Sequence, residues 1–315
     1  MNLTSAYPAR KVLLIRDPDR RLVADSMKIP GFHGTEISLG EGQTRIMGVV
    51  NVTPDSFSDG GSFLQPERAI QHGLALIEQG ADILDIGGES TRPDYTPVSV
   101  EEQIARTQPV IAGLRQATSI PISIDTTRAA VAAAGLAAGA DWINDTSALV
   151  DDPELAAVAV QHACPIVLMH RFDPARNASS RQVGPAMVEA VVKNLELRVQ
   201  FAQGQGIDPT RIILDPGLGF GTLFEDNLFL MADINPLRRL PHPWLFGPSR
   251  KSFIGEMTGK PASDRLHGTS AAVAILAMQG VEVLRVHDVA AMVDVVRVAD
   301  RLRMVSSQQL NTQNS

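Results

Sequence analysis

The feature that most constrains the fold is an alternation between short apolar runs and longer amphipathic stretches. The apolar runs begin near Ile46, Asp82, Pro121, Asp141, Pro165, Arg211, Pro243 and Val283. Helical character is expected between them, at residues 67–79, 100–117, 128–138, 153–162, 185–203, 223–240, in a pair across 251–279, and at 289–302. This pattern is typical of a buried parallel sheet made from βα units. About eight units suit a closed (β/α)8 barrel, although periodicity alone leaves an open doubly wound sheet as an alternative.

Composition narrows the class of protein. The chain has 315 residues, of which 44% are hydrophobic, and this is enough for one large core or two modest ones. A net charge of -7 argues against a nucleic-acid binder, although a local basic pocket for a small anion remains allowed. No apolar run approaches the ~18 residues of a membrane span, and no charged start followed by an apolar core marks the N-terminus. We therefore expect a soluble, cytoplasmic protein.

The chain has one cysteine, Cys164, which lies directly before Pro165 in an apolar run. One cysteine allows no intramolecular disulfide, and this suits a reducing compartment. A catalytic thiol would need a partner such as His162 or His170, which flank it in the sequence. We favour the alternative, a buried structural cysteine.

Three segments are expected: an N-terminal extension at residues 1–43, a barrel at 44–305, and a polar tail at 306–315. Within the extension, residues 11–16 and 21–24 have strand character and 17–19 are typical of a turn. Residues 30–34 are rich in loop-forming types. These features predict a short hairpin or cover packed on the barrel, with a regulatory or partner-binding arm as the alternative.

Polar side chains recur where the expected strands end. The positions are Asn51, Asp85, Asp125, Asn144, His170, Asp215, Arg285 and His287. The carboxyl ends of barrel strands surround one axis, so residues far apart in the sequence would meet in one bowl. A single Asp or Asn after a strand could instead cap the next helix. Because a polar residue recurs at the carboxyl end of one expected strand after another, we interpret these residues as one site.

The chemistry of three of these residues makes recognition of a planar group possible. Asp125, Asn144 and Asp215 offer carboxylates and an amide, and a carboxylate can accept two parallel N–H bonds from an amino-pyrimidinone edge. The competing interpretation is a metal cage at Asp125 and Asp215, since carboxylate oxygens suit Mg²⁺.

Basic residues indicate an anion site. Arg285 and His287 are two positions apart on one expected strand, so their side chains point to the same face. Together with Arg92 on an irregular loop and Lys251 at a helix start, they would suit a pyrophosphate group. The alternative is that each arginine pairs with a structural carboxylate, and we expect this for Arg250.

Seven sequence segments carry a family resemblance. They are Asn51-Val-Thr-Pro-Asp-Ser-Phe-Ser-Asp59-Gly-Gly, Asp85-Ile-Gly-Gly-Glu-Ser-Thr91-Arg92-Pro93, Ile122-Ser-Ile-Asp125-Thr, Ile143-Asn144-Asp-Thr, Asp215-Pro-Gly-Leu-Gly-Phe220-Gly, Ser249-Arg-Lys251-Ser252-Phe-Ile-Gly and Arg285-Val-His287-Asp-Val. In this order, across residues 45–303, they resemble the bacterial dihydropteroate synthases, the sulfonamide-target enzymes of folate synthesis. The resemblance favours the (β/α)8 barrel over the open sheet.

The resemblance implies a transferase. It would condense 6-hydroxymethyl-7,8-dihydropterin pyrophosphate with p-aminobenzoate to give 7,8-dihydropteroate and pyrophosphate. It also implies Mg²⁺ as cofactor and a homodimer as the assembly.

The resemblance also assigns roles to individual residues. It implies a pterin site of Asp85, Asp125, Asn144, Met169, Asp215, Phe220, Gly247 and Lys251. It implies a pyrophosphate site of Asn51, Arg92, Arg285 and His287, with Mg²⁺ on Asn51. It implies a p-aminobenzoate site of Thr91, Arg92, Pro93, Phe220 and Ser252. The catalytic residues would be Asp59, Arg92, Lys251, Arg285 and His287.

The chain departs from the family pattern in two places. Thr222 follows Gly-Phe-Gly where many members have Lys, and Arg171 begins a different segment after Met169-His170. Arg171 could offset the lost positive charge. Two other functions remain open. A pterin-binding methyltransferase with a corrinoid partner would not need the basic anion set, and a non-catalytic paralogue would bind pterin or a partner protein.

Overall fold

The computed structural model describes residues 27–31, 33–34, 36–40, 42–52, 65–89, 98–172 and 183–313. Within these ranges, eight parallel strands form one sheet in the order β8-β7-β6-β5-β4-β3-β10-β9. They are β3 (Arg45–Asn51), β4 (Ile83–Gly87), β5 (Ile122–Asp125), β6 (Trp142–Asp145), β7 (Ile166–Met169), β8 (Ile212–Asp215), β9 (Leu245–Phe246) and β10 (Val283–Val286). A parallel bridge between Leu214 and Trp244 joins the two edges of the sheet. The sheet therefore curls into the expected barrel rather than staying open.

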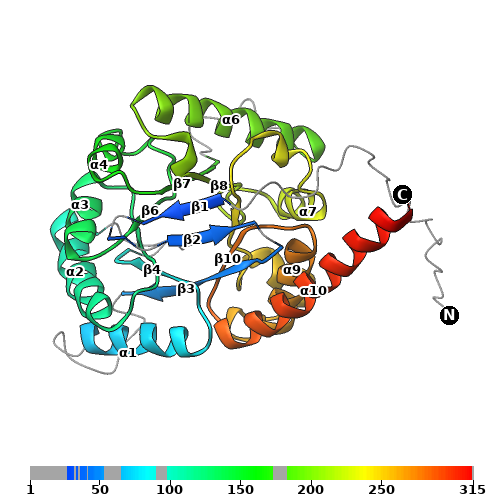
Figure 1. Cartoon of the computed structure of the whole chain (residues 1–315), viewed down its shortest axis with the longest axis horizontal. Helices are drawn as coiled ribbons and strands as arrows, with labels where there is room; N and C mark the ends of the chain where they lie inside the picture. Colours follow the sequence, from blue (N-terminus) through cyan, green and yellow to red (C-terminus); the bar gives the residue numbers. More distant parts are fainter. Residues whose placement is uncertain are drawn as a thin grey trace.

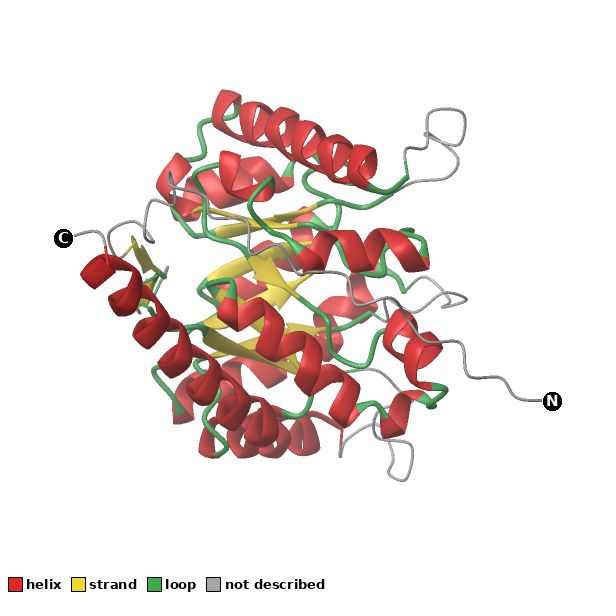
Figure 2. Cartoon of the chain, turned by 90° about the vertical axis from the view of Figure 1, so that its right-hand side faces the viewer, coloured by secondary structure: helices red, strands yellow, loops and turns green. Residues whose placement is uncertain are grey.

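Helices surround this barrel, as Figure 1 and the side view in Figure 2 show. They are α1 (Gln65–Glu78), α2 (Val100–Ala117), α3 (Ala129–Ala138), α4 (Leu155–His162), α6 (Pro185–Gly204), α7 (Phe224–Ala232), α8 (Ser252–Thr258), α9 (Leu266–Met278) and α10 (Val289–Gln313). Short 3-10 turns lie at Pro209–Arg211, Leu237–Arg239 and Ala262–Asp264. None of the helices in the described ranges is long and apolar enough to cross a membrane.

Two helices differ from the expected bounds. The helix expected at 223–240 ends at Ala232, and only a 3-10 turn follows at Leu237–Arg239. Pro236 explains the break, because the residue before a proline disfavours helical backbone. At the other end of the chain, α10 continues to Gln313, through most of the stretch for which a polar tail was expected.

The strand sequences are apolar because both faces of the barrel sheet are buried. Ile46, Leu84 and Ile143 belong to the core between strands and helices. Met47 and Ile83 point inward and belong to a second cluster inside the barrel. Because successive residues of a strand face opposite sides, the same alternation decides which polar residues reach the barrel interior.

A two-stranded hairpin closes the end of the barrel at which the strands begin. It consists of β1 (Met27–Pro30) and β2 (Glu36–Leu39), and Figure 1 shows it lying across the barrel. Ile29 and Leu39 of the hairpin are buried in the inner cluster. The strands expected at residues 11–16 and 21–24 lie outside the described residues. Of the loop expected at 30–34, Pro30 instead ends β1, and Gly31, His33 and Gly34 follow the strand.

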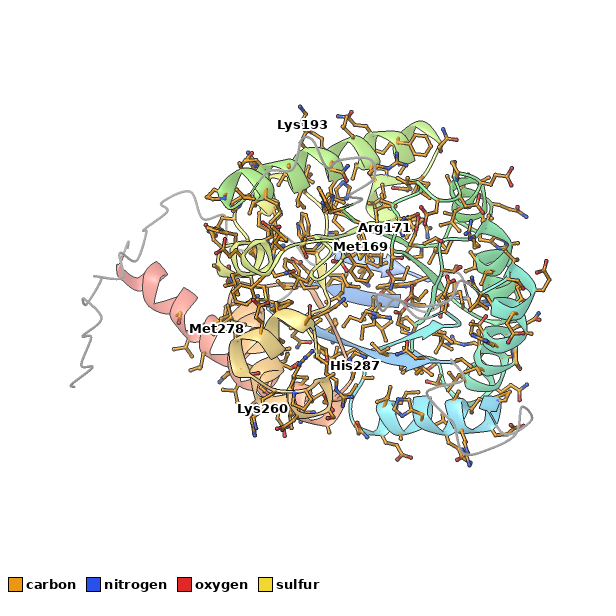
Figure 3. The ribbon with its side chains drawn as sticks, turned by 180° about the vertical axis from the view of Figure 1, so that it is seen from behind. Met169, Arg171, Lys193, Lys260, Met278 and His287 are labelled. Carbon is orange, nitrogen blue, oxygen red and sulfur yellow. The ribbon has the colours of Figure 1, made fainter. Side chains whose placement is uncertain are left out.

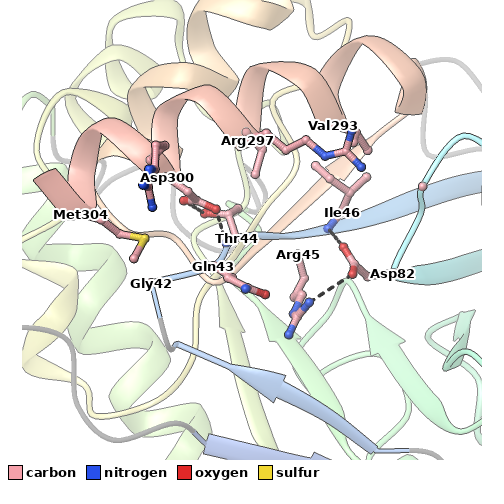
Figure 4. Close-up of a pocket in the computed structure, with 13 residues that line it drawn as sticks. Gly42, Gln43, Thr44, Arg45, Ile46, Asp82, Val293, Arg297, Asp300 and Met304 are labelled. Atoms are coloured by element: carbon pink, nitrogen blue, oxygen red, sulfur yellow. Dashed lines mark hydrogen bonds and ion pairs between the residues drawn. The ribbon is translucent and has the colours of Figure 1, made fainter.

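A cleft of ≈ 420 Å³ lies at this same end of the molecule, between α10 and the start of β3 (Figure 4). Asp300 of α10 accepts hydrogen bonds from the N–H and the hydroxyl of Thr44, at 2.7 and 3.0 Å. Arg45 pairs with Asp82 at 3.3 Å. The cleft therefore lies at the end of the barrel away from the polar strand ends, and Asp300 is the charged group that holds α10 against the barrel.

Candidate active site

The centre of the site is an arginine held by two carboxylates. Arg285 on β10 donates from Nε to Oδ2 of Asp85 at 2.6 Å and from Nη2 to Oδ2 of Asp125 at 2.8 Å. Asn144 on β6 also donates to Oδ2 of Asp85, at 3.1 Å. The four residues come from β4, β5, β6 and β10, and the residue before each of them belongs to the helix-facing core, namely Leu84, Ile124, Ile143 and Leu284. The barrel interior is therefore where their polar groups must meet.

This arrangement changes the expectation for Arg285. The sequence allowed either a guanidinium available to an anion or one paired with carboxylates, and the structure has the paired arrangement. Both carboxylates belong to the expected ring site, so the pairing neutralises charge inside the site itself. Burial alone would lower the pKa of Arg285, but Asp85 and Asp125 outweigh it and the pKa is raised. Arg285 therefore stays protonated.

Asp215 ends β8 and opens a loop that needs its glycines. Its Oδ1 accepts the N–H of Gly217 at 2.7 Å. Gly217 has φ 76, and a Cβ there would collide with the carbonyl of His170. The N–H of Gly219 donates to Thr222 and to Asn227, at 3.0 and 2.7 Å. The loop is thus fixed in a shape that only glycine allows.

The same loop meets the lysine of the site. The Nζ of Lys251 lies 4.0 Å from the centre of the Phe220 ring, and a Cβ at Gly219 would lie 3.0 Å from its Cδ. An ammonium over an aromatic face is an attractive arrangement. Lys251 immediately precedes α8, which begins at Ser252. One short segment therefore supplies two expected site residues, Lys251 and Ser252.

Burial shifts the protonation of this cluster. Burial lowers the pKa of Lys251 to about 8, and Arg285 contributes in the same direction. Burial raises the pKa of Asp215 to about 6. Burial, and next the charge of Asp85, raises the pKa of Asp125. Acidic and basic groups are therefore driven toward similar pKa values, as is common in functional sites.

His287 is a hydrogen-bonding group rather than a cation at neutral pH. Burial, followed by the charge of Arg285, lowers the pKa of His287 to about 4. Its Nδ1 lies 3.0 Å from the hydroxyl of Ser249, which also accepts the backbone N–H of His287 at 3.2 Å. Ser249 therefore orients the imidazole. Ser249 stands in the same segment as Lys251, but nothing in the sequence pattern marks it as a partner of His287.

The remaining described site residues line the same bowl. Met169 is buried at the end of β7, and Gly247 lies beside Arg285, whose Cβ would be 4.0 Å from a Cβ added there. Asn51 ends β3, and its Oδ1 and the Oδ2 of Asp125 lie 3.8 and 3.6 Å from the position of a Cβ on Gly87. Figure 3 shows Met169 and His287 toward the middle of the molecule.

Four expected site residues, Asp59, Thr91, Arg92 and Pro93, lie outside the described residues. Shortly after β4, the carboxylate of Glu89 accepts hydrogen bonds from the N–H of Val98 at 2.9 Å and from the side chain of Gln103 at 3.3 Å. Glu89 thus joins the residues that follow β4 to the start of α2.

Arg171 was considered as a source of positive charge, and Cys164 as a reactive thiol. Arg171 does not replace the charge missing at Thr222, because it pairs with Asp151 at 2.6 Å. Cys164 is fully buried, and burial raises the pKa of its thiol to about 12, so it is a structural cysteine. The expectation for Arg250 is confirmed, since it pairs with Asp288 at 2.5 Å.

The metal cage considered for Asp125 and Asp215 gains no support. Among the described residues, no group of three His, Cys, Asp or Glu side chains is placed to hold a metal ion. Asp125 is engaged by Arg285, and Asp215 by the N–H of Gly217. Asn51 offers a single amide oxygen, which suits an ion that takes its other ligands from a substrate.

Comparison with known proteins gives the family. A model of the family described as "Pterin binding enzyme" matches residues 47–287. A dihydropteroate synthase of Synechocystis is 45% identical over 262 residues, which cover 82% of this chain and 90% of the relative. The chain belongs to the dihydropteroate synthase family. The matched range begins in β3 and ends at His287, so it contains every strand that supplies the cluster.

Solved structures of dihydropteroate synthases agree with this assignment. The enzyme of Xanthomonas albilineans with 4-aminobenzoic acid matches with a TM-score of 0.82 and 43% identity, covering 89% of this chain and 99% of that chain. The same enzyme in complex with 7,8-dihydropteroate gives a TM-score of 0.79 and 41% identity, with 88% and 98% covered. The chain thus spans nearly the whole length of these dihydropteroate synthases.

Proposed function

We propose that this chain catalyses the dihydropteroate synthase reaction. It transfers the dihydropterin methylene group from pyrophosphate to the amino group of p-aminobenzoate, giving 7,8-dihydropteroate. The observation that carries the proposal is the cluster at the strand ends, where Asp125, Asn144, Asp215, Lys251 and Arg285 come together in a chain of this family. The curated relatives that carry the synthase name favour this reaction over methyl transfer to a corrinoid.

The pterin ring is proposed to lie among Asp85, Asp125, Asn144 and Asp215. Carboxylates that face the amino-pyrimidinone edge would accept its N–H groups, and the amide of Asn144 can both donate and accept. The N–H groups of the ring would compete with Arg285 for Asp125, to which Arg285 donates at 2.8 Å. Ring binding would thereby release part of the guanidinium for the leaving group.

The walls of the proposed pterin site would come from the glycine-containing loop after β8 and from β7. Lys251 stands over Phe220, and Met169 is buried beside Gly217. Gly247 has no side chain, so the backbone of the chain can approach the ring there. A flat ring between an aromatic side chain and a thioether gains dispersion energy over its whole face.

Arg285 and His287 are proposed to receive the pyrophosphate. The carbon–oxygen bond breaks, the electron pair leaves with the pyrophosphate, and a ring nitrogen of the dihydropterin stabilises the methylene cation. Arg285 is protonated, and neutral His287 can donate one N–H, so both can stabilise the departing charge. The amino nitrogen of p-aminobenzoate then forms the new carbon–nitrogen bond and loses a proton. Bond breaking therefore needs no protein nucleophile.

Mg²⁺ is part of the proposal through Asn51. Asn51 ends β3, and its Oδ1 lies on one side of Gly87, 3.8 Å from the position of an added Cβ. Mg²⁺ in phosphate sites usually takes one or two protein ligands together with waters and substrate oxygens, and Asn51 fits that pattern. When bound, the ion would neutralise pyrophosphate charge.

Ser252 is proposed to seat the carboxylate of p-aminobenzoate. It is the first residue of α8, is exposed, and directly follows Lys251. A position directly after Lys251 would bring its hydroxyl next to the proposed ring site. Thr91, Arg92 and Pro93 would complete the seat, and Asp59 and Arg92 would assist at the pyrophosphate, as the family resemblance implies.

We also propose a homodimer and a cytoplasmic location. Adjacent helices carry exposed apolar side chains, namely Phe229 on α7 at 41%, Met257 on α8 at 51% and Ile275 on α9 at 51%. Exposed apolar side chains on neighbouring helices are typical of a protein interface. The free thiol of Cys164 suits a reducing compartment.

The reaction is tested with the purified chain, dihydropterin pyrophosphate, p-aminobenzoate and Mg²⁺. We expect dihydropteroate, identified by mass spectrometry, in equal amount to the pyrophosphate released. Omission of p-aminobenzoate or of Mg²⁺ should abolish product formation. If the pterin substrate binds but no dihydropteroate forms with both substrates and Mg²⁺ present, the chain is a non-catalytic member of the family and the proposal fails.

A further inference from the structure

Three buried polar atoms lie beneath the charged cluster and have no hydrogen-bond partner within the described part of the chain. They are Oδ1 of Asp85, Oγ of Ser123 and Nε1 of Trp142. All three residues are 0% exposed. A buried polar atom without a partner costs free energy, and most such atoms in folded proteins are paired with protein or with ordered water.

The sheet register places the three residues side by side. Asp85 on β4 is the partner of Ser123 on β5, and Ser123 is the partner of Trp142 on β6. Their neighbours Leu84, Ile122 and Ile143 belong to the helix-facing core, so the three side chains point into the barrel. Adjacent strands lie about 4.8 Å apart, so Ser123 stands between Asp85 and Trp142, whose strands are about 9.6 Å apart, a span that the carboxylate and indole side chains can close with one bridging water.

The three atoms have complementary hydrogen-bonding character. The indole N–H of Trp142 can only donate, the oxygen of Asp85 can only accept when ionised, and the hydroxyl of Ser123 can do both. One water molecule can accept from Trp142, donate to Asp85 and form a third bond with Ser123. A polar interior position with about three partners is typical of a structural water.

We propose that Asp85, Ser123 and Trp142 bind an ordered water, and that Ser123 and Trp142 are positioning residues for Asp85. The other oxygen of Asp85, Oδ2, accepts from Arg285 at 2.6 Å and from Asn144 at 3.1 Å. A water on Oδ1 fixes the plane of the carboxylate. The direction of Arg285, and with it the placement of the leaving group, then depends on two residues that touch no substrate.

The water is tested directly by a crystal structure of the ligand-free full chain. We expect a density peak within hydrogen-bond distance of all three atoms, and we expect Trp142→Phe to remove or displace it. Trp244→Phe is the matched control, because the Nε1 of Trp244 is also buried without a partner but lies in the helix-facing core. An empty position, or direct hydrogen bonds that join Trp142, Ser123 and Asp85, would overturn the proposal.

Steady-state kinetics tests the positioning role. Trp142→Phe and Ser123→Ala should each lower kcat by about fivefold to tenfold, the effect of losing one hydrogen bond between an uncharged side chain and the water. The KM for p-aminobenzoate and the activity of Trp244→Phe should stay unchanged. The double variant should be no slower than the slower single variant, because both act through one water.

The outcomes separate this inference from the proposed reaction. Unchanged kcat, or losses that multiply in the double variant, would contradict a shared water. If Trp142→Phe does not fold, Ser123→Ala alone still tests both the density and the kcat. The kinetic part rests on the proposed reaction, whereas the crystallographic part does not, so a chain without synthase activity could still be found to hold the water.

Discussion

At the scale of single residues, the account rests on the partners of Arg285. The sequence predicts an anion ligand at Arg285, with a structural partner of carboxylates as the alternative. The structure makes it the link between Asp85 and Asp125, two carboxylates of the proposed pterin seat. Ring binding and charge stabilisation are therefore connected through one side chain.

Replacing this side chain should slow the reaction strongly. Removal of a preorganised donor from a developing charge costs about 2.7–4 kcal/mol, so Arg285→Ala should lower kcat by about a hundredfold or more. Arg285→Lys keeps the charge but not the two-pronged geometry and should recover only part of the loss. Pyrophosphate release is the measurement. Near-normal turnover of Arg285→Ala would remove its assigned role.

Affinity for the pterin substrate should depend on pH in both directions. The ring needs ionised Asp215, whose pKa is raised to about 6 by burial, so affinity should fall as the pH drops below that value. The pyrophosphate-bearing substrate favours protonated Lys251, whose pKa is lowered to about 8 by burial, so affinity should also fall above that value. Calorimetric titration across this range is the measurement.

One variant separates the two limbs of that profile. Lys251→Arg keeps its charge throughout the accessible range, because arginine remains protonated in proteins. The loss of affinity on the alkaline side should disappear while the loss on the acidic side remains. An unchanged alkaline limb in Lys251→Arg would assign that limb to another group.

At the scale of elements, α10 is held to the barrel by a buried carboxylate. Asp300 accepts two hydrogen bonds from Thr44 and pairs with Arg303 at 2.9 Å. Hydrogen bonds to a charged group contribute about 1.5–3 kcal/mol, so Asp300→Ala should lower the free energy of unfolding by about that amount. Denaturant unfolding measures the change.

The same helix offers the control for this prediction. Asp294 also pairs with an arginine on α10, but its side chain is 81% exposed and the distance to Arg297 is 3.8 Å. Exposed pairs contribute about 0–1 kcal/mol, so Asp294→Ala should change stability little. Equal losses for the two variants would mean that Asp300 acts through helix formation and not through Thr44.

Most elements could be predicted from the sequence, and the misses have physical causes. The apolar runs place every barrel strand, because burial on both faces leaves little choice of residue. Only two residues of the run that begins near Pro243 form β9. The helix expected at 223–240 is interrupted before Pro236, and the proline rule itself could have shown this.

The sequence predicts which residues belong to the candidate site, but it does not predict the hydrogen bonds among them. Asp125, Asn144, Asp215 and Arg285 stand at strand ends, and barrel geometry brings such ends together. The pairing of side chains depends on strand register and on side-chain rotamers. Neither can be read from a single sequence. The bond from Ser249 to His287 and the pairing of Arg171 with Asp151 were missed for this reason.

At the scale of the whole molecule, the two ends of the barrel have different tasks. The hairpin of β1 and β2 packs Ile29 and Leu39 into the inner cluster at one end. The polar strand ends form the site at the other. The proposed dimer interface lies on the helical side that carries Phe229, Met257 and Ile275.

The dimer predicts a defined response to charge. A double variant, Met257→Glu with Ile275→Glu, should shift the chain from dimer to monomer in sedimentation velocity, because two carboxylates would be buried without partners in each copy. Leu197→Glu is the control, since Leu197 is 54% exposed on α6 and does not belong to the proposed surface. Dissociation by the control, or none by the double variant, would place the interface elsewhere.

The central claim, that the strand-end cluster holds the pterin ring, is tested most directly by calorimetric titration of dihydropterin pyrophosphate into Asp215→Asn. The asparagine can still accept the N–H of Gly217, which keeps the loop, but it loses the charge and one acceptor. Each lost bond to a carboxylate contributes about 1.5–3 kcal/mol, so the account predicts binding weaker by about tenfold to a hundredfold. Unchanged affinity would contradict the account.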